Sequence, residues 1–289
     1  MADFRVKTER RLIDCLTDIG YTRTKVKQLM RHRAVEVNGK AAQGFDHLLR
    51  KGDTVSVRKD ENKSKVVPSL GIKIIFEDDD LIVIEKPAGL LTIASETEKT
   101  KTAYYQLNEF LKLRTPRTRK RIFIVHRLDQ GTSGLIVFAK NEKAKRTLQE
   151  GWKEVEKRYY ALVEGTPVKK MGWIRSRLSE TKSLKVYSDP HSDGAKLSET
   201  KYRVVKTGRE YSLLDILLET GRKNQIRVHL SDIGHPVAGD KKYGAKTDPL
   251  GRLGLHSYRL MFKHPVTGDP LRFESKLPRR FDRLILCPG

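Results

Sequence analysis

Residues 125–135 read VHRLDQGTSGL and are flanked by two short apolar runs, at 121–125 and 135–138. Glycine, threonine and serine in this stretch allow the backbone to turn tightly between two strands, so the turn can present the carboxylate of Asp129 at the edge of a sheet. A carboxylate with an ordinary pKa of about 3.9 is anionic at neutral pH and can act as nucleophile or base without activation. On spacing alone, however, an aspartate in a turn more often serves the turn itself.

Short β-branched runs alternate with a smaller number of helical patterns along residues 70–289. We expect strands at 72–76, 81–85, 134–138, 159–163, 202–205 and 213–218, and helices at 103–113 and 142–152. The strands outnumber the helices and do not follow a strict βαβ order. This segment is therefore predicted to be α+β, with a large mixed, mainly antiparallel sheet and flanking helices.

Residues 1–58 form a separate small pattern of two helices followed by a hairpin. Apolar residues recur at helical spacing up to Gly20, and a second helix begins near Thr22, a residue suited to an N-cap. The Asn38-Gly39 pair, next to alternating strand residues, is a strong hairpin signal because both residues tolerate positive φ. The polar, charged stretch at 59–69 is expected to be a linker.

The second expected helix carries Arg23, Lys27 and Arg31 at i, i+4 and i+8, so three cations share one face. A run of charge is usually a solvated face, but no acidic residue lies between Thr22 and Val35. The face is therefore predicted to contact phosphates. Residues 112–121 contain six basic residues and no acid, which indicates either a solvated loop or, as we prefer, a basic rim.

The overall composition points to nucleic acid as the partner. The 289 residues contain 59 Lys and Arg against 36 Asp and Glu, a net charge of +23, and such a field attracts phosphate backbones. No apolar run approaches the roughly 20 residues that span a bilayer. Cys15 and Cys287 form no CxxC pair, so neither a disulfide framework nor a zinc site is expected. We expect a cytoplasmic protein without an export signal, and a monomer.

Residues 126–135 match every fixed position of the signature of RluA-type pseudouridine synthases, and His126 favours this branch over the RsuA type. Residues 79–90, 156–165, 220–230 and 234–244 are similar to further motifs of the same family. Residues 8–58 resemble the S-four-like RNA-binding module. The resemblance implies an N-terminal RNA-binding domain over 1–58, a linker over 59–69 and a catalytic domain over 70–289.

This resemblance implies isomerisation of uridine to pseudouridine in structured RNA, with Asp129 as the catalytic residue. Arg227 would supply an opposing charge and bidentate hydrogen bonds to Asp129, Tyr159 would stack on the uracil and could handle a proton, and Ile226 would pack against the ring. Arg127, two residues from Asp129, is a candidate to fill the space that a flipped uridine leaves. Without the resemblance, core packing would be preferred for Tyr159 and Ile226.

The implied reaction involves no net oxidation or hydrolysis, so no cofactor and no metal are expected. His126, His229 and His235 lack supporting ligands at metal-site spacing. One departure concerns Lys223-Asn224, where the family commonly has Thr-His. The expected substrate is large-subunit ribosomal RNA, with transfer RNA second. Two other functions were weighed: a non-catalytic RNA-binding ribosome-assembly factor, and a carboxylate hydrolase, which would need a second acid near Asp129.

Overall fold

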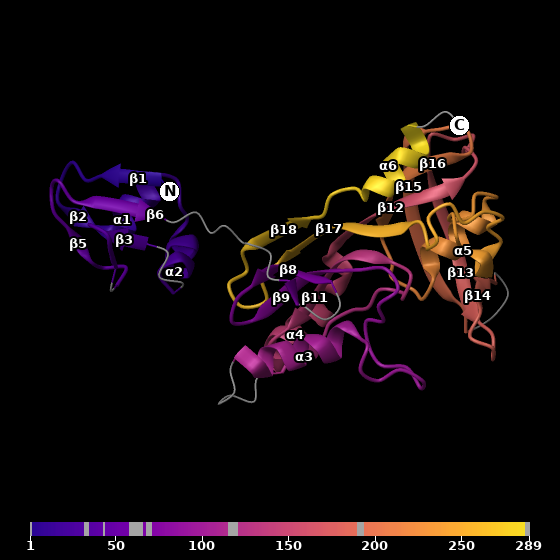
Figure 1. Ribbon diagram of the computed structural model, residues 1–289, viewed down its shortest axis with the longest axis horizontal. Helices are drawn as coiled ribbons and strands as arrows, with labels where there is room; N and C mark the ends of the chain where they lie inside the picture. The colour runs from indigo at the N-terminus through magenta and orange to yellow at the C-terminus, as the bar shows by residue number, and fades with distance from the viewer. Residues whose placement is uncertain are drawn as a thin grey trace. The chain divides into compact units, whose positions relative to one another are not determined.

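The chain forms two compact units, Met1–Lys63 and Ser64–Gly289 (Figure 1). The computed structural model describes residues 2–31, 35–42, 44–57, 66–67, 71–114, 121–189 and 194–286. The linker expected at 59–69 lies outside the described residues except for Val66 and Val67. Of the helices in the described ranges, none combines the length and the apolar character that crossing a bilayer requires.

The first unit packs two helices against a small sheet. Its elements are β1 (Ala2–Arg5), β2 (Arg10–Arg11), α1 (Leu12–Asp18), α2 (Arg23–Arg31), β3 (Val35–Val37), β4 (Lys40–Ala41), β5 (Leu48–Leu49) and β6 (Thr54–Val57). The main sheet has the order β1-β6-β3-β4, and β2 pairs separately with β5. Leu12, Leu16 and Val26 are fully buried in its core. The two helices predicted from the apolar spacing are thus confirmed.

The predicted hairpin is confirmed at Asn38-Gly39. β3 and β4 pair antiparallel across these two residues, whose φ values are 50° and 77°. The other edge of β3 pairs with β6, the second alternating run. β1, which the apolar pattern did not predict, pairs with β6 and completes the sheet.

The second unit is built on a twelve-stranded mixed sheet. Its order is β14-β13-β15-β16-β12-β17-β11-β9-β8-β7, with β10 beside β11 and β18 beside β17. Among the described strands, every pairing in this sheet is antiparallel except the short one between β11 and β17. The predicted α+β class with a large, mainly antiparallel sheet is confirmed.

Each predicted run lies within one strand of this sheet. The strands are β7 (Val66–Val67), β8 (Ile72–Glu77), β9 (Leu81–Lys86), β10 (Phe123–Ile124), β11 (Ser133–Ala139), β12 (Glu156–Glu164), β13 (Met171–Glu180), β14 (Val186–Ser188), β15 (Lys196–Thr207), β16 (Tyr211–Leu218), β17 (Leu255–Lys263) and β18 (Pro270–Glu274). All six predicted strands are present, as β8, β9, β11, β12, β15 and β16.

Helices cover both faces of the sheet. They are α3 (Ala103–Arg114), α4 (Glu142–Glu150), α5 (Gln225–Asp232) and α6 (Arg279–Leu286), with 3-10 turns at Trp152–Glu154 and Lys241–Tyr243. Ile136 and Phe138 of β11 share a core with α3 and α5, whereas Leu135 and Val137 share another with α4. Because side chains alternate across a strand, α3 and α5 lie on one face and α4 on the other. α5 lies beside β13 and β14, and α6 beside β16 (Figure 1).

Candidate active site

The turn that carries Asp129 connects β10 to β11. The backbone N–H of Thr132 donates to the carbonyl oxygen of Asp129 at 3.1 Å, which closes the turn. Gln130 is tied to Gly89 twice: its carbonyl accepts from the Gly89 N–H at 2.9 Å, and its Nε2 donates to the Gly89 carbonyl at 3.1 Å. The turn predicted from glycine, threonine and serine is therefore present, and the loop after β9 holds it in place.

Asp129 lines a pocket on the face of the sheet that α5 covers. The pocket is small: its cavity volume is about 90 Å³, below the roughly 300–1,000 Å³ of ordinary ligand sites. The Asp129 side chain is 27% exposed. The structure brings together in this lining the five residues implied by the resemblance: Arg127, Asp129, Tyr159, Ile226 and Arg227.

The prediction that Arg227 makes bidentate hydrogen bonds to Asp129 is wrong. Its Nε and Nη2 donate to the two carboxylate oxygens of Asp240, at 2.6 and 2.7 Å. Nη1 donates to Oδ2 of Asp129 at 3.3 Å and to Oδ1 of Asn224 at 2.8 Å. The Asp240 side chain is only 1% exposed, and a buried carboxylate requires the full guanidinium fork more than a partly exposed one does.

The charge of Arg227 is secured by this arrangement. Burial alone would lower its pKa, but the hydrogen bonds and charge of Asp240, with the charge of Asp129, outweigh burial and raise it. Arg227 therefore stays cationic and gives Asp129 an opposing charge through one long contact. Asp240 lies in the motif at 234–244, but no role was predicted for it, because no local pattern in the sequence shows which cation it contacts.

Tyr159 and Ile226 approach the pocket from different elements. Tyr159 lies on β12 and is 7% exposed; Ile226 lies in the first turn of α5 and is 4% exposed. Burial, and next the charge of Asp129, raise the pKa of the Tyr159 hydroxyl. Tyr159 thus remains protonated at neutral pH, so it is suited to donate a hydrogen bond rather than to accept a proton.

Asn224 acquires a place in the site that the sequence did not predict. It precedes α5 in a left-handed conformation, with φ 55°, which asparagine tolerates better than most residues. Its Oδ1 accepts from Arg227, and its Nδ2 donates to the hydroxyl of Tyr243 at 3.0 Å. Asn224 therefore orients the guanidinium of Arg227 at the position where the family commonly has histidine.

Lys86 is a second residue without a predicted role. It is fully buried at the end of β9. Its Nζ donates to the carbonyl oxygens of Pro87, Leu90 and Gln130, at 3.0, 2.6 and 3.2 Å. Burial, and then the charge of Arg252, lower its pKa to about 7, while the charge of Asp129 opposes this change. The lysine thus connects the loop after β9 to the Asp129 turn.

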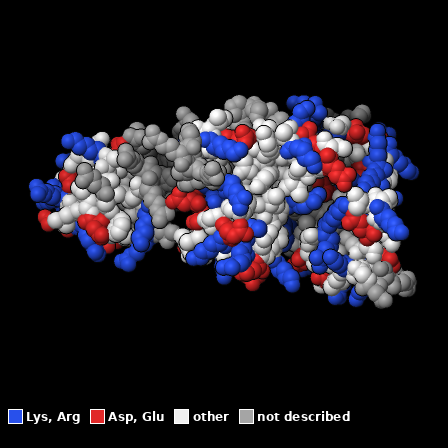
Figure 2. All heavy atoms as spheres, turned by 90° about the horizontal axis from the view of Figure 1, so that it is seen from below, with Lys and Arg blue, Asp and Glu red and all other residues white. Residues whose placement is uncertain are grey.

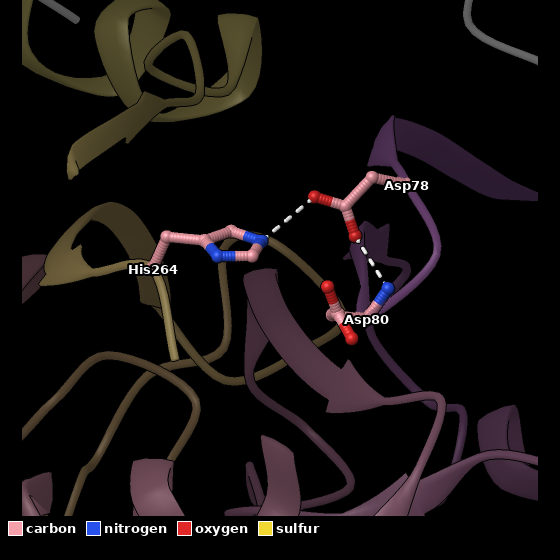
Figure 3. Close-up of side chains that lie close together, drawn as sticks. All are labelled: Asp78, Asp80 and His264. Carbon is pink, nitrogen blue, oxygen red and sulfur yellow. Dashed lines mark hydrogen bonds and ion pairs between the residues drawn. The ribbon is translucent and has the colours of Figure 1, made fainter. Parts of the chain in front are cut away.

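Asp78, Asp80 and His264 form the one group of three metal-ligating side chains found among the described residues (Figure 3). Nδ1 of His264 accepts the backbone N–H groups of Val266 and Thr267, at 3.2 and 3.1 Å. The ring proton is therefore on Nε2, which faces Oδ2 of Asp78 at 2.9 Å. A nitrogen that carries a proton offers no lone pair to a metal, so the group is arranged as a hydrogen-bonded pair, which becomes an ion pair when the ring takes up its second proton.

The histidines weighed for metal binding lie apart in other hydrogen bonds. Nε2 of His126 accepts the backbone N–H of Val137 at 3.1 Å. The ring nitrogens of His229 lie 2.8 and 3.0 Å from hydroxyls of Thr200 and Ser176. Nδ1 of His235 lies 2.9 Å from the carbonyl of Glu164.

The predicted RNA-contacting cations are only partly described. Arg23 and Lys27 are exposed on α2. Arg31 ends α2, but its side chain lies outside the described residues, as do residues 115–120 of the expected basic rim. In the second unit, Figure 2 shows Lys and Arg side chains gathered at the end that carries β13–β16 and α5.

Comparisons with known proteins agree on one family. A family model described as RNA pseudouridylate synthase matches residues 80–232. The uncharacterized RNA pseudouridine synthase YhcT of Bacillus subtilis is 34% identical over 284 residues, which cover 94% of this chain and 90% of that protein. The ribosomal large subunit pseudouridine synthase D of Neisseria meningitidis serogroup B is 33% identical over 282 residues, which cover 92% of this chain and 74% of that protein.

The fold comparison gives the same result. The structure of human RNA pseudouridylate synthase domain containing 4 superposes with a TM-score of 0.61 at 26% identity, covering 72% of this chain and 90% of that one. The structure of human RNA pseudouridylate synthase domain containing 1 superposes with a TM-score of 0.60 at 25% identity, covering 74% and 86%.

Proposed function

Because the chain belongs to the RluA-type RNA pseudouridine synthases, isomerases that convert uridine to pseudouridine, we propose that Asp129 is its catalytic residue and large-subunit ribosomal RNA its substrate. The single observation that supports this most is the placement of Asp129. Its carboxylate is partly exposed in a pocket and lies 3.3 Å from the charged Arg227. The name of the Neisseria relative supports the choice of RNA.

The reaction breaks the bond from the ribose C1′ to N1 of uracil and forms a bond from C1′ to C5. The proton on C5 is released, and N1 gains a proton, so atoms and electrons balance without a redox partner. The carboxylate of Asp129 acts either by attack on the sugar or base, or by removing a proton from the ribose. Both routes require the ionised carboxylate, beside which Nη1 of Arg227 lies at 3.3 Å.

The pocket lining suits a base that has left its helix. Unstacking a base requires a few kcal/mol, which contacts inside the pocket must offset. Tyr159 and Ile226 offer aromatic and aliphatic surface to the ring and exclude water from it. Arg127 is exposed at the rim, where its planar guanidinium can occupy the vacated space.

We propose that the first unit also binds RNA. We assign it to the S-four-like module over residues 1–58, joined by the linker at 59–69 to the catalytic domain at 70–289. The exposed Arg23 and Lys27 on α2 are its phosphate contacts, together with Arg31. We also propose that the protein is cytoplasmic and monomeric and that it uses no cofactor.

The decisive experiment measures release of tritium from RNA labelled at C5 of uracil. Wild type is compared with Asp129→Asn, which keeps the shape and removes the charge, and with Asp80→Asn as a matched control outside the pocket lining. We expect the Asp129 variant to lose at least about a thousandfold in rate, on the order of 4 kcal/mol in the barrier, and the control to match wild type.

Three outcomes would contradict the proposal. Equal release by wild type and Asp129→Asn would remove Asp129 from the mechanism. Transfer RNA as the preferred substrate in a panel of labelled RNAs would replace ribosomal RNA. Binding without release from any RNA in the panel would favour the assembly-factor function.

A further inference from the structure

A continuous chain of hydrogen bonds adjoins the Asp129 turn. Nη2 of Arg252 donates to Oγ of Ser133 at 2.8 Å, and this hydroxyl lies 2.8 Å from Nδ1 of His256. Nε2 of His256 lies 3.0 Å from Oγ of Ser275, which donates to Oε1 of Glu85 at 2.8 Å. The chain crosses from the loop before β17 to β9 through β11, β17 and Ser275, the residue after β18.

The carboxylate end of the chain fixes the direction of the hydrogen bonds as far as Nε2 of His256. A guanidinium can only donate, and a carboxylate can only accept. Ser275 therefore gives its one proton to Glu85 and accepts the Nε2 proton of His256. Ser133 accepts from Arg252, and its own proton is available to Nδ1. A neutral imidazole with its proton on Nε2 satisfies all of these contacts.

The burial of His256 agrees with this assignment. The side chain is only 1% exposed. Burial, and then the charge of Arg252, lower its pKa to about 4. A second proton on the ring would bring another positive charge near the guanidinium of Arg252.

The chain closes into a ring around the catalytic turn. Glu85 at one end is the neighbour of Lys86, whose Nζ donates to the carbonyl of Gln130 at 3.2 Å. Ser133, which follows Arg252 in the hydrogen-bond chain, lies three residues after Gln130 in the sequence. The ring therefore holds the turn after Asp129 at two points, the Gln130 carbonyl and the Ser133 hydroxyl.

The backbone of β11 and β17 brings these side chains together. Ser133 pairs with His256, and Gly134 with Ser257, in the parallel register. Gly134 has φ +110°, and a Cβ there would lie 2.1 Å from the carbonyl oxygen of Ser257. Only glycine permits this close approach, which places Ser133 against the imidazole.

We propose that His256 is a positioning residue for the isomerisation: through Ser133 its neutral imidazole fixes the turn that presents Asp129 to the uridine. This inference rests on the proposed role of Asp129. His256 is absent from the pocket lining, so its effect falls on the placement of the carboxylate rather than on RNA binding. A misplacement of about 1 Å can lower a rate by about a hundredfold.

The test separates catalysis from binding and from stability. Single-turnover rates on saturating labelled RNA, RNA affinity and thermal unfolding are measured for wild type, His256→Leu and His256→Asn. We expect His256→Leu to lose about a hundredfold in rate with RNA affinity unchanged. His256→Asn keeps an acceptor for Ser133 and should recover to within about tenfold of wild type.

His264→Gln is the matched control, because it removes a buried imidazole just beyond the opposite end of β17 and should keep the wild-type rate. Ser133→Ala, which deletes one hydroxyl, replaces His256→Leu if that variant does not fold, and should lose about tenfold. A folded His256→Leu with the wild-type rate overturns the inference. So does a loss of rate that His256→Asn does not recover.

Asp129→Asn is run in the same assay to distinguish the two proposals. If it retains the wild-type rate, the proposed catalytic residue is wrong. If it is inactive while folded His256→Leu keeps the wild-type rate, only the positioning role is wrong.

Discussion

Asp129 lies beside Arg227 and Asp78 beside His264, yet the two carboxylates accept very different sets of hydrogen bonds. Asp78 accepts from His264 with one oxygen and from the backbone N–H groups of Asp80 and Leu81 with the other, at 2.7–2.9 Å. The hydrogen-bonding capacity of this cluster is used within the protein, which suits a structural role.

The Asp129 cluster divides its hydrogen bonds unequally. Asp240 takes two short bonds from Arg227, and Asp129 receives one contact at 3.3 Å while facing the pocket. The buried carboxylate therefore anchors the cation, and the exposed one keeps capacity for a substrate. The difference teaches that spare hydrogen-bonding capacity beside a pocket, rather than the number of charged groups, distinguishes the carboxylate that we propose to be catalytic.

Asp240→Asn should break this division and give the largest effect. With the charge of Asp240 removed, Arg227 should turn towards Asp129 and occupy the proposed catalytic carboxylate. We expect a loss of about 3 kcal/mol in the free energy of unfolding, since a buried charge loses its partner, and about a hundredfold in rate. Urea unfolding and single-turnover tritium release measure the two quantities. A destabilised variant with the wild-type rate would show that Asp240 does not set the geometry of Asp129.

His264→Gln should sharpen the comparison, because it disrupts the hydrogen bond between His264 and Asp78 and leaves the Asp129 cluster unchanged. The hydrogen bond to Asp78 raises the pKa of His264 above its ordinary value of about 6.5. The ion pair therefore stabilises the fold fully below about pH 6.5 and is lost as the pH rises through the raised pKa. The difference in unfolding free energy from wild type should be about 1 kcal/mol near pH 5.5 and shrink near pH 8.5.

The measurement is urea unfolding at the two pH values, with tritium release as the control. Activity should match wild type, because this cluster does not contact the pocket lining. A difference that grows with pH would refute the ion pair.

The double variant Arg23→Ala with Lys27→Ala extends the comparison to cations that are exposed to solvent. Of the three changes, it is expected to have the smallest effect. Losing two phosphate contacts should reduce the slope of log affinity against log salt by about 1.5. Titrations of labelled RNA at several salt concentrations measure this slope. Lys40→Ala with Lys51→Ala, two exposed cations of the same unit away from α2, is the control. Equal slopes for both pairs would mean that α2 is not a special contact face.

Much of the fold could be predicted because its strands are locally apolar. Runs such as 81–85 and 213–218 are buried on both faces of the sheet, so they stand out without knowledge of their partners. β13 was missed because its outward positions are exposed and its inward positions include Gly172 and Ser176. α5 was missed because Asn224 starts it from a left-handed conformation rather than as an ordinary N-cap.

The resemblance predicted five residues of the pocket lining, but the sequence did not predict the hydrogen bonds that Arg227 makes or the part played by Asn224. The motif residues meet at one pocket, as the resemblance implied. The partner of Arg227 depends on the burial of Asp240, and one hydrogen bond of Lys86 goes to the carbonyl oxygen of Gln130, 44 residues away in the sequence. Such long-range choices follow from the folded geometry, and sequence spacing does not encode them.

Gly134 has a consequence for how this chain can drift over generations. Any single-base missense change in a glycine codon introduces a Cβ, and at this position every Cβ meets the same main-chain oxygen of Ser257 at 2.1 Å. Small and large side chains therefore clash equally at Cβ, and no replacement avoids the clash. The codon has no tolerated missense neighbours, so the seam between β11 and β17 is expected to stay constant while its surroundings diverge.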